Sequence, residues 1–241
     1  MDEGTLGRVR GLWEELAGGR FPGTGEVRVL TTGASRLCPP GWAGMILLDG
    51  AVLATAPTAE QADLLTAALA DAGSLFSLER PGTGSLPVLE SLGPAGLAYL
   101  SPADLQSYGD ERPEDPARPA PGIDWAGPDE VAPLLAAADP AEAGESGLEG
   151  LPRAAVVRSG GQVVAACGWE RWPADTAHLC VLTHPDHRGR GHATRVAAVA
   201  SADALAAGLL PQWRARVRPS LRVADKLGYQ LVAHQRSLRL A

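Results

Sequence analysis

The sequence predicts an α/β (α+β) protein in two parts, each with strands and helices of its own. Helical patterns place apolar residues three and four positions apart, and strand-like runs are bounded by turn residues such as Asp49-Gly50. Between the two parts, residues 106–122 are dense in proline and charge and contain almost no large apolar residue. We therefore expect an N-terminal α/β domain at 1–105, a Pro-rich linker at 106–122 and a second domain at 123–241.

The first part begins with a helix over 6–16, because Val9, Leu12, Trp13 and Leu16 recur at helical spacing before Gly18-Gly19. The dipeptide Asp49-Gly50 tolerates positive φ and favours a hairpin. The further elements expected here are strands at 26–30, 45–48, 51–54 and 95–100 and a helix at 58–71.

The second part predicts an antiparallel meander that leads into a helix. The expected elements are a helix at 128–138, strands at 154–158, 162–169 and 178–183, a helix at 191–207, a strand at 212–217, a short helix at 219–227 and one or two last strands within 229–240. Gly208 and Gly228 follow the two later helices, as is typical of helix ends.

Charge and hydropathy exclude several classes of protein. The 241 residues carry a net charge of −7 with a single lysine, Lys226, which is a poor basis for binding a nucleic-acid backbone. No apolar run approaches the about 20 residues of a membrane span, and residues 1–3 lack the basic start of a signal peptide. We expect a soluble cytoplasmic protein, a monomer or homodimer, that binds neither nucleic acid nor membrane.

The charge is also uneven along the chain. Residues 179–241 contain ten Lys and Arg against three Asp and Glu, whereas residues 1–178 contain eleven against twenty-five. The C-terminal segment can therefore attract an anion, and the acidic remainder favours a cationic partner molecule.

The cysteines and histidines do not predict a metal site or a disulfide framework. Cys38, Cys167 and Cys180 form no CxxC pair and are expected to be reduced, buried small side chains. His184, His187 and His192 lie close in sequence, but no carboxylate or cysteine cluster completes a four-ligand set beside them. Hence no metal is expected.

The most informative segment is Thr183–Thr194, with the sequence THPDHRGRGHAT. It combines a strand end, a glycine-rich turn and a helix start. The first N–H groups of a helix bind phosphate, Gly189 and Gly191 allow the backbone to come close, and Arg188 and Arg190 add charge. The chain contains neither GxxxxGK[ST] nor GxGxxG with an acidic residue about 20 positions later, so we expect a different pyrophosphate cradle.

This segment resembles motif A of the GNAT superfamily of N-acetyltransferases, whose [Q/R]xxGx[G/A] signature is matched by Arg188, Gly191 and Ala193. Residues 220–229 are similar to the family's second motif, a short helix that ends in "KLGY". Together with Gly208–Trp213, these motifs most resemble the zwittermicin-resistance type of acetyltransferase. The resemblance covers about residues 123–241 and leaves 1–105 as an α/β domain that could be a degenerate relative.

The resemblance implies the GNAT fold, a mixed and mostly antiparallel sheet flanked by helices, and acetyl-CoA (coenzyme A) as co-substrate. By the same resemblance, Leu182 and Thr183 pair with the pantetheine arm. The pyrophosphate is implied to bind at Arg188, Gly189, Arg190, Gly191, His192, Ala193 and Thr194. The implied reaction is direct attack of a primary amine on the thioester, with no metal.

The sequence departs from the family at the expected proton donor. Many members carry a tyrosine four residues before the glycine of the second motif, whereas this chain has Ala224. Tyr229 occupies the position after that glycine, where the family residue packs in the core. For the base, His178 and Glu170 are the candidates, since both are expected on neighbouring strands beside the acyl end of the co-substrate.

Two functions therefore remain open. The first is an acetyl-CoA-dependent N-acetyltransferase that acts in a ternary complex on a small-molecule amine acceptor, with a cationic acceptor favoured by charge. The alternative is a catalytically weakened CoA-binding regulatory or binding module, since the usual acid is missing. The intact glycines of the turn argue against a third possibility, a structural pairing protein. A thiolate is a tolerable leaving group, since its conjugate acid has a pKa of roughly 8–9, and this favours the enzyme over the binding module.

Overall fold

The computed structural model describes residues 1–69, 75–77, 82–83, 86–101 and 121–241. Packing divides the chain into two compact units, which are described separately. The first comprises residues 1–98, 214–221 and 231–241, and the second comprises residues 99–213 and 222–230. The expected linker at 106–122 lies outside the described residues except for its last two, and the proposed domain boundaries remain a prediction.

The first unit begins with α1 (Glu3–Ala17), which buries Val9, Leu12, Trp13 and Leu16 as the spacing predicts. Asp2 caps the helix by accepting a hydrogen bond from the Thr5 backbone N–H, and Gly18 ends it in the left-handed region. The other elements are β1 (Val27–Thr31), β2 (Ala43–Leu48), β3 (Ala51–Ala56), α2 (Ala59–Ala68), β4 (Val88–Tyr99) and β10 (Gln230–Leu240).

The strands of this unit follow the order β1-β3-β2-β10-β4. Asp49-Gly50 joins β2 to β3 as the predicted hairpin, with φ of 49° at Asp49 and 72° at Gly50. β10 runs antiparallel to β2, with Ala233 opposite Leu48 and Leu238 opposite Ala43. The last strand of the chain therefore packs with the first half of the sequence, although sequence order places it in the second domain.

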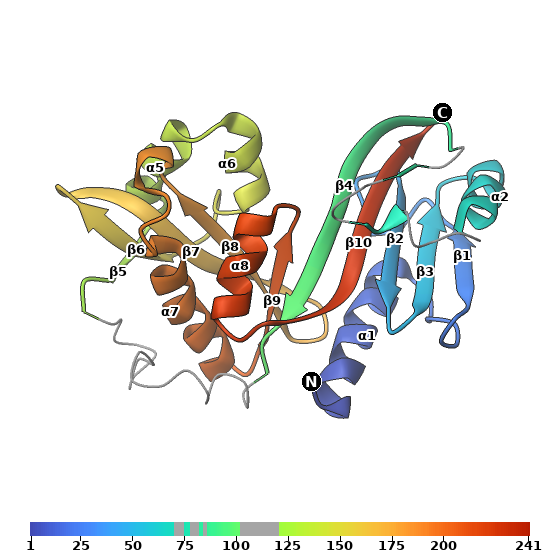
Figure 1. Cartoon of the computed structure of the whole chain (residues 1–241), viewed down its shortest axis with the longest axis horizontal. Coiled ribbons are helices and arrows are strands. Elements are labelled where there is room, and N and C mark those ends of the chain that lie inside the picture. Colours follow the sequence, from blue (N-terminus) through green and yellow to red (C-terminus); the bar gives the residue numbers. More distant parts are fainter. Residues whose placement is uncertain (70–74, 78–81, 84–85, 102–120) are drawn as a thin grey trace. The chain divides into compact units, whose positions relative to one another are not determined.

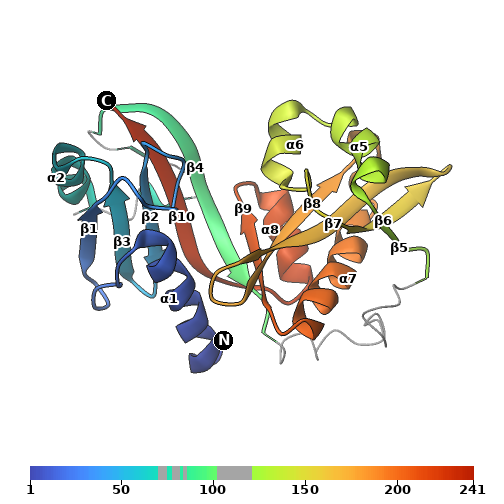
Figure 2. The ribbon, with the colours of Figure 1, turned by 180° about the vertical axis from the view of Figure 1, so that it is seen from behind.

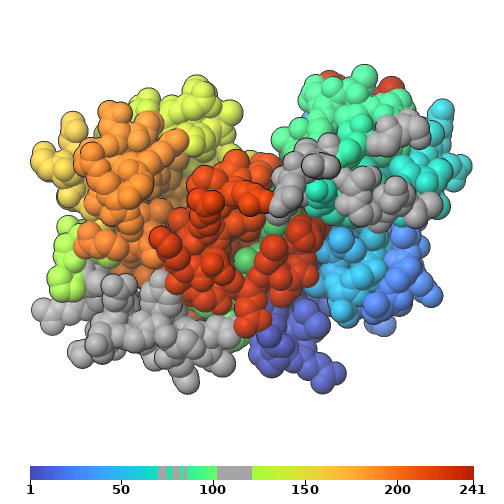
Figure 3. Space-filling model, in the orientation of Figure 1, coloured from blue at the N-terminus to red at the C-terminus, as the bar shows by residue number. Residues whose placement is uncertain are grey.

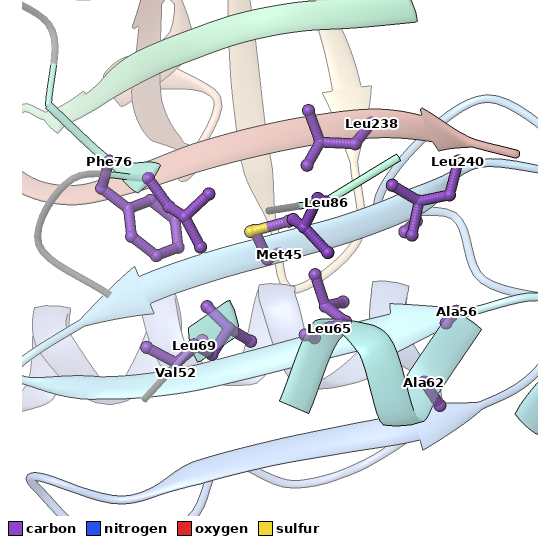
Figure 4. Close-up of a cluster of buried hydrophobic side chains, with 13 residues drawn as sticks. Met45, Val52, Ala56, Ala62, Leu65, Leu69, Phe76, Leu86, Leu238 and Leu240 are labelled. Atoms are coloured by element: carbon purple, nitrogen blue, oxygen red, sulfur yellow. The ribbon is translucent and has the colours of Figure 1, made fainter. Parts of the chain in front are cut away.

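An apolar cluster packs between the strands of this sheet and α2 (Figure 4). Met45, Val52 and Leu238 contribute from three strands, and Leu65 contributes from α2. All four side chains are 0–2% exposed, and burial of each such side chain is worth roughly 1.5–3 kcal/mol.

The second unit contains the sheet that carries the motif A segment (Figure 1). Its strands follow the order β9-β8-β7-β6-β5. The elements are β5 (Asp124–Ala126), α5 (Pro128–Ala137), α6 (Pro140–Ser146), β6 (Ala154–Ser159), β7 (Gln162–Trp172), β8 (Thr176–Thr183), α7 (His192–Ala206), β9 (Leu210–Ala215) and α8 (Arg218–Lys226), with the last residues of β9 and the first of α8 counted in the first unit.

Strands β5 to β8 are antiparallel and β9 joins β8 in parallel, so the sheet is mixed. Helix α7 packs on β6, β7 and β8, as the view from behind shows (Figure 2). On the other face, Val131 and Leu134 of α5 pack with Ala166 of β7 and with Cys180 and Leu182 of β8. The expected mixed sheet flanked by helices is confirmed.

Within the described residues, the structure has a helix or strand at each expected place, with β9 two residues earlier than expected, and adds three features. Residues 70 and 71 of the expected helix at 58–71 lie outside the described residues. Helix α6 and strand β5 were not predicted, because they contain only seven and three residues and α6 includes Gly144. β4 begins at Val88 rather than near Ala95, since Gly93 and Pro94 lie inside the strand where they normally mark a break.

Asp203 of α7 ties that helix to the sheet. Its carboxylate accepts hydrogen bonds from Arg153 Nη2 at 2.6 Å and from Trp169 Nε1 at 2.9 Å. Arg153 also lies over the ring of Trp125, with 4.3 Å from its guanidinium carbon to the ring centroid. Asp203 is only 9% exposed, so these partners replace water as the hydrogen-bond donors to its carboxylate.

We expect the Asp203→Ala substitution to lower the free energy of unfolding by about 2 kcal/mol, because it removes two hydrogen bonds to a charged acceptor. Asp225→Ala on α8 is the matched control, since Asp225 is exposed and its removal is expected to change stability by less than about 0.5 kcal/mol. Urea unfolding of both variants measures the difference. Equal stability of the two variants would contradict the role of Asp203.

Among the described residues, none of the helices combines the length and the apolar character needed to cross a bilayer.

Candidate active site

The loop between β8 and α7 presents an open helix N-terminus. The short 3-10 turn Pro185–His187 is followed by Arg188–Gly191, all of which are exposed, and then by α7. The orange atoms that include this segment lie at the surface in the space-filling view (Figure 3). The first hydrogen bond of the helix runs from the backbone N–H of Arg195 to the carbonyl of Gly191. The backbone N–H groups of His192, Ala193 and Thr194 come before this bond and therefore have no acceptor within the helix.

Gly189 and Gly191 adopt the left-handed conformation that gives this loop its shape. Their φ angles are 75° and 80°, a region that side chains with a Cβ rarely occupy. No described atom lies within 4 Å of where a Cβ would stand on either residue. Gly191 is also the N-cap and supplies no side-chain acceptor to the helix amides. Thus this part of the loop is not covered by side chains at the two glycines, which is compatible with an anion cradle.

The charges around the loop are positive, with one ion pair that the sequence did not predict. Arg188 donates from Nη2 to Glu142 of α6 at 2.6 Å, and both side chains are about half exposed. Arg195 donates to the carbonyl of Pro121 at 3.0 Å. The pKa of His192 lies below its usual value because its ring is desolvated, and Arg195, His187 and Arg190 add to this effect. An anion at this place would relieve the repulsion.

The three histidines of the loop lie near one another but do not form a metal site. The ring centroids of His184 and His187 are 5.5 Å apart, and those of His187 and His192 are 6.3 Å apart. Within the described part of the chain, no group of three or more His, Cys, Asp or Glu side chains could hold a metal ion.

Strand β8 connects this loop to the predicted base. Its parallel register with β9 extends only over Thr176–His178 and ends where His178 stands opposite Gln212. Beyond that point the edge of Leu179–Thr183 is not paired with β9 and extends for about 16 Å. Leu182 and Thr183 lie in this part of β8, and the hydroxyl of Thr183 is buried without a hydrogen-bond partner.

His178 and Glu170, the two predicted bases, stand opposite each other on β8 and β7. The ring of His178 stacks on Trp172, with centroids 4.3 Å apart and planes at 15°. Trp172 in turn donates from Nε1 to a carboxylate oxygen of Glu170 at 3.0 Å. His178 is only 7% exposed, whereas Glu170 is exposed. The structure therefore brings both candidates into one cluster with a tryptophan.

Two buried residues that the sequence did not single out complete this cluster. Nδ1 of His178 lies 2.8 Å from Oε1 of Gln212 on β9, and Nε2 of Gln212 donates to the hydroxyl of Tyr99 at 3.0 Å. Gln212 and Tyr99 are both fully buried. Glu170, His178 and Gln212 are in register on three adjacent strands, and a polar row of this kind is invisible until the strand register is known.

The remaining nucleophilic and acidic candidates are structural. Cys167 and Cys180 are buried as expected, and burial raises the pKa of Cys167 well above its usual value. Cys38 is partly exposed, with its pKa raised to about 11 by burial. Tyr229 packs against Trp213, its hydroxyl lies 2.7 Å from Ser201 Oγ, and burial raises its pKa. The expectation that Tyr229 is a core residue is confirmed.

Residues 154–236 match the family model described as GNAT acetyltransferase. This segment makes up about a third of the chain. It contains β8, the glycine loop and α7, together with His178, Glu170 and Gln212. The sequence resemblance to the GNAT superfamily is confirmed at this level.

Several solved structures are similar to the chain. A GNAT-family protein from Novosphingobium aromaticivorans is 22% identical, with 64% of this chain and 67% of that chain covered and a TM-score of 0.45. A GCN5-related N-acetyltransferase-like protein from Streptococcus suis is 21% identical, with 77% and 70% covered and a TM-score of 0.46. A GCN5-related N-acetyltransferase from Kribbella flavida is 20% identical, with 62% and 58% covered and a TM-score of 0.45. No curated protein matches the chain.

Proposed function

We propose that the protein is an acetyl-CoA-dependent N-acetyltransferase that transfers the acetyl group directly to a primary amine of a small molecule. The observation that carries this proposal is the open N-terminus of α7 behind two left-handed glycines, inside the segment that matches the GNAT acetyltransferase model. The finer likeness to the zwittermicin-resistance type belongs to the same proposal and rests on the sequence motifs alone.

The residues of the loop fit coenzyme A, which supplies the acetyl thioester when bound. The amides of His192, Ala193 and Thr194 and the backbone of Gly189–Gly191 offer donors to a pyrophosphate, and Arg190 adds positive charge. Leu182 and Thr183 offer the edge of β8 and a buried hydroxyl without a partner to the pantetheine arm. Arg188 is paired with Glu142, so its proposed contribution requires the exchange of that partner.

We assign the base to His178 rather than to Glu170. An imidazole ordinarily titrates near neutral pH and can take a proton from the ammonium group of the acceptor substrate. The ring of His178 is held in place by Trp172 and Gln212. The carboxylate of Glu170 accepts the Trp172 N–H and stands beside the same row. Glu170 is therefore proposed to hold Trp172 and to attract the positively charged acceptor.

A tyrosine acid is not part of the proposed mechanism. Ala224 occupies the usual position of that acid and is buried, and the hydroxyl of Tyr229 is engaged by Ser201. A thiolate is a tolerable leaving group, since its conjugate acid has a pKa of about 8.5. We expect the transfer to proceed without a dedicated proton donor from the second motif.

The proposed acceptor is cationic, because residues 1–178 hold twenty-five acidic side chains against eleven basic ones. We expect kcat/KM for a polyamine or aminoglycoside-like acceptor to fall as the salt concentration rises from about 0.01 to 0.5 M, since screening weakens electrostatic steering. A neutral hydroxylamine or an uncharged aromatic amine serves as the control and should respond less. Equal salt dependence of both acceptor types would contradict a cationic acceptor.

Two measurements test the proposed function. Calorimetric titration measures the binding of acetyl-CoA and of desulfo-coenzyme A, and an assay of thiol release then measures turnover with a panel of amines. Binding together with turnover supports the transferase. Binding without turnover in any amine supports the alternative of a CoA-binding regulatory module, which the missing tyrosine at Ala224 motivates. If neither ligand binds, the assignment of the loop is wrong.

A further inference from the structure

We propose that Gln212, anchored by Tyr99, is a positioning residue that fixes His178 in the tautomer with the proton on Nδ1 and the lone pair on Nε2. This inference rests on the proposed role of His178 as base. The motif resemblance assigns no role to Gln212 or Tyr99, and the two residues belong to strands β9 and β4.

The hydrogen bonds define a direction along the row. Nε2 of Gln212 is a donor only, and it donates to the Tyr99 hydroxyl at 3.0 Å. Oε1 of the same amide is an acceptor only and faces Nδ1 of His178 at 2.8 Å. With the amide in this orientation Nδ1 carries the proton, which leaves Nε2 as the basic nitrogen of the neutral ring.

Burial makes this arrangement costly to rearrange. Gln212 and Tyr99 are 0% exposed, so rotating the amide away from His178 would leave its polar groups without water or partner. Tyr99 belongs to the same compact unit as His178, and the backbone N–H of the next residue, Leu100, donates to the carbonyl of Pro211 beside Gln212. Tyr99 is therefore held at the place where it anchors the amide.

Packing fixes the plane of the ring as the hydrogen bond fixes its tautomer. The ring of Trp172 covers one face of His178 at 4.3 Å, and Trp172 is held by Glu170. With both its plane and its tautomer fixed, the ring keeps Nε2 pointing in one direction. Correct orientation of a base accounts for much of the rate enhancement that the base provides.

The test is the tautomer of His178, measured by nitrogen NMR on protein labelled in its five histidines, with the signal assigned through a His178→Gln sample. We expect a protonated Nδ1 and an unprotonated Nε2 in the wild-type protein at a pH where the ring is neutral. We expect Gln212→Leu and Tyr99→Phe to give mixed tautomers, and Gln212→Glu to restore the Nδ1–H form, because a carboxylate oxygen also accepts from Nδ1. A proton on Nε2 in the wild-type protein would overturn the proposal, whether or not the protein transfers acetyl groups.

Kinetics then separates positioning from folding. We expect Gln212→Leu to lower kcat by at least about 10-fold, within the about 10²–10⁴-fold that a base provides, while KM for acetyl-CoA changes less than about 2-fold. Gln212→Glu should recover part of this loss. Gln235→Leu is the matched control, since Gln235 is another buried glutamine, bonded to the carbonyl of Leu37 in the first unit, and its loss should leave the tautomer and kcat unchanged.

Each result decides one of the two proposals. An unaltered tautomer and kcat in folded Gln212→Leu would overturn the positioning role, even with full acetyltransferase activity in the wild-type protein. A wild-type protein that binds acetyl-CoA without turnover would overturn the proposed function, and the NMR measurement would still decide whether Gln212 sets the tautomer.

Discussion

Replacing His178 with glutamine is expected to lower kcat by about 10²–10⁴-fold, because the variant loses the group proposed to accept the proton of the amine. Glutamine can still hydrogen-bond to Gln212 and is close in size to histidine, so the row across β7, β8 and β9 is expected to stay in register. The affinity for acetyl-CoA should change less than about 2-fold, since the glycine loop lies at the other end of β8. Steady-state kinetics and calorimetry measure the two quantities.

Glu170→Gln is the matched control for this prediction. Its amide oxygen can accept the Trp172 N–H as the carboxylate does, so the support of the His178 ring is kept. We expect a loss in kcat of less than about 10-fold, with a larger effect on KM for a cationic acceptor. If instead Glu170→Gln loses about 10²–10⁴-fold in kcat while His178→Gln stays active, the base is Glu170.

The sequence could predict the parts of this site that depend on local backbone chemistry. Gly189 and Gly191 predict a turn with positive φ, and their φ angles in the structure are 75° and 80°. His178 and Glu170 follow from strand assignment, since a meander places residues of consecutive strands side by side. These inferences require only the nearest neighbours along the chain.

The parts that depend on long-range register could not be predicted. Tyr99 and Gln212 are separated by more than a hundred residues, and their hydrogen bond exists only because the end of β4 lies beside β9. The ion pair of Arg188 with Glu142 belongs to the same class, since α6 is too short and too rich in small residues to be recognised. For this reason the sequence could propose His178, Glu170 and the glycine loop as parts of the site but not the groups that contact them.

Replacing Gly191 with valine is expected to raise the dissociation constant for coenzyme A by more than about 10-fold, which corresponds to about 1.4 kcal/mol. The new side chain would extend into the open space in front of the amides of His192 and Ala193, where the pyrophosphate is proposed to bind. Valine at φ of 80° is also strained, so part of the effect on the protein is a loss of stability. Calorimetry with coenzyme A and urea unfolding measure the two effects separately.

Gly208→Val separates blocking from strain, because Gly208 follows the other end of α7 and has nearly the same φ, 77°, with no described atom within 4 Å of its Cβ position. Both variants should therefore lose similar stability, and only Gly191→Val should lose affinity for coenzyme A. Equal losses of affinity would show that strain in α7, and not a blocked cradle, weakens binding. Wild-type affinity in folded Gly191→Val would place the pyrophosphate elsewhere, and the loop of Arg188–Gly191 would then have to be explained as a turn that only connects β8 to α7.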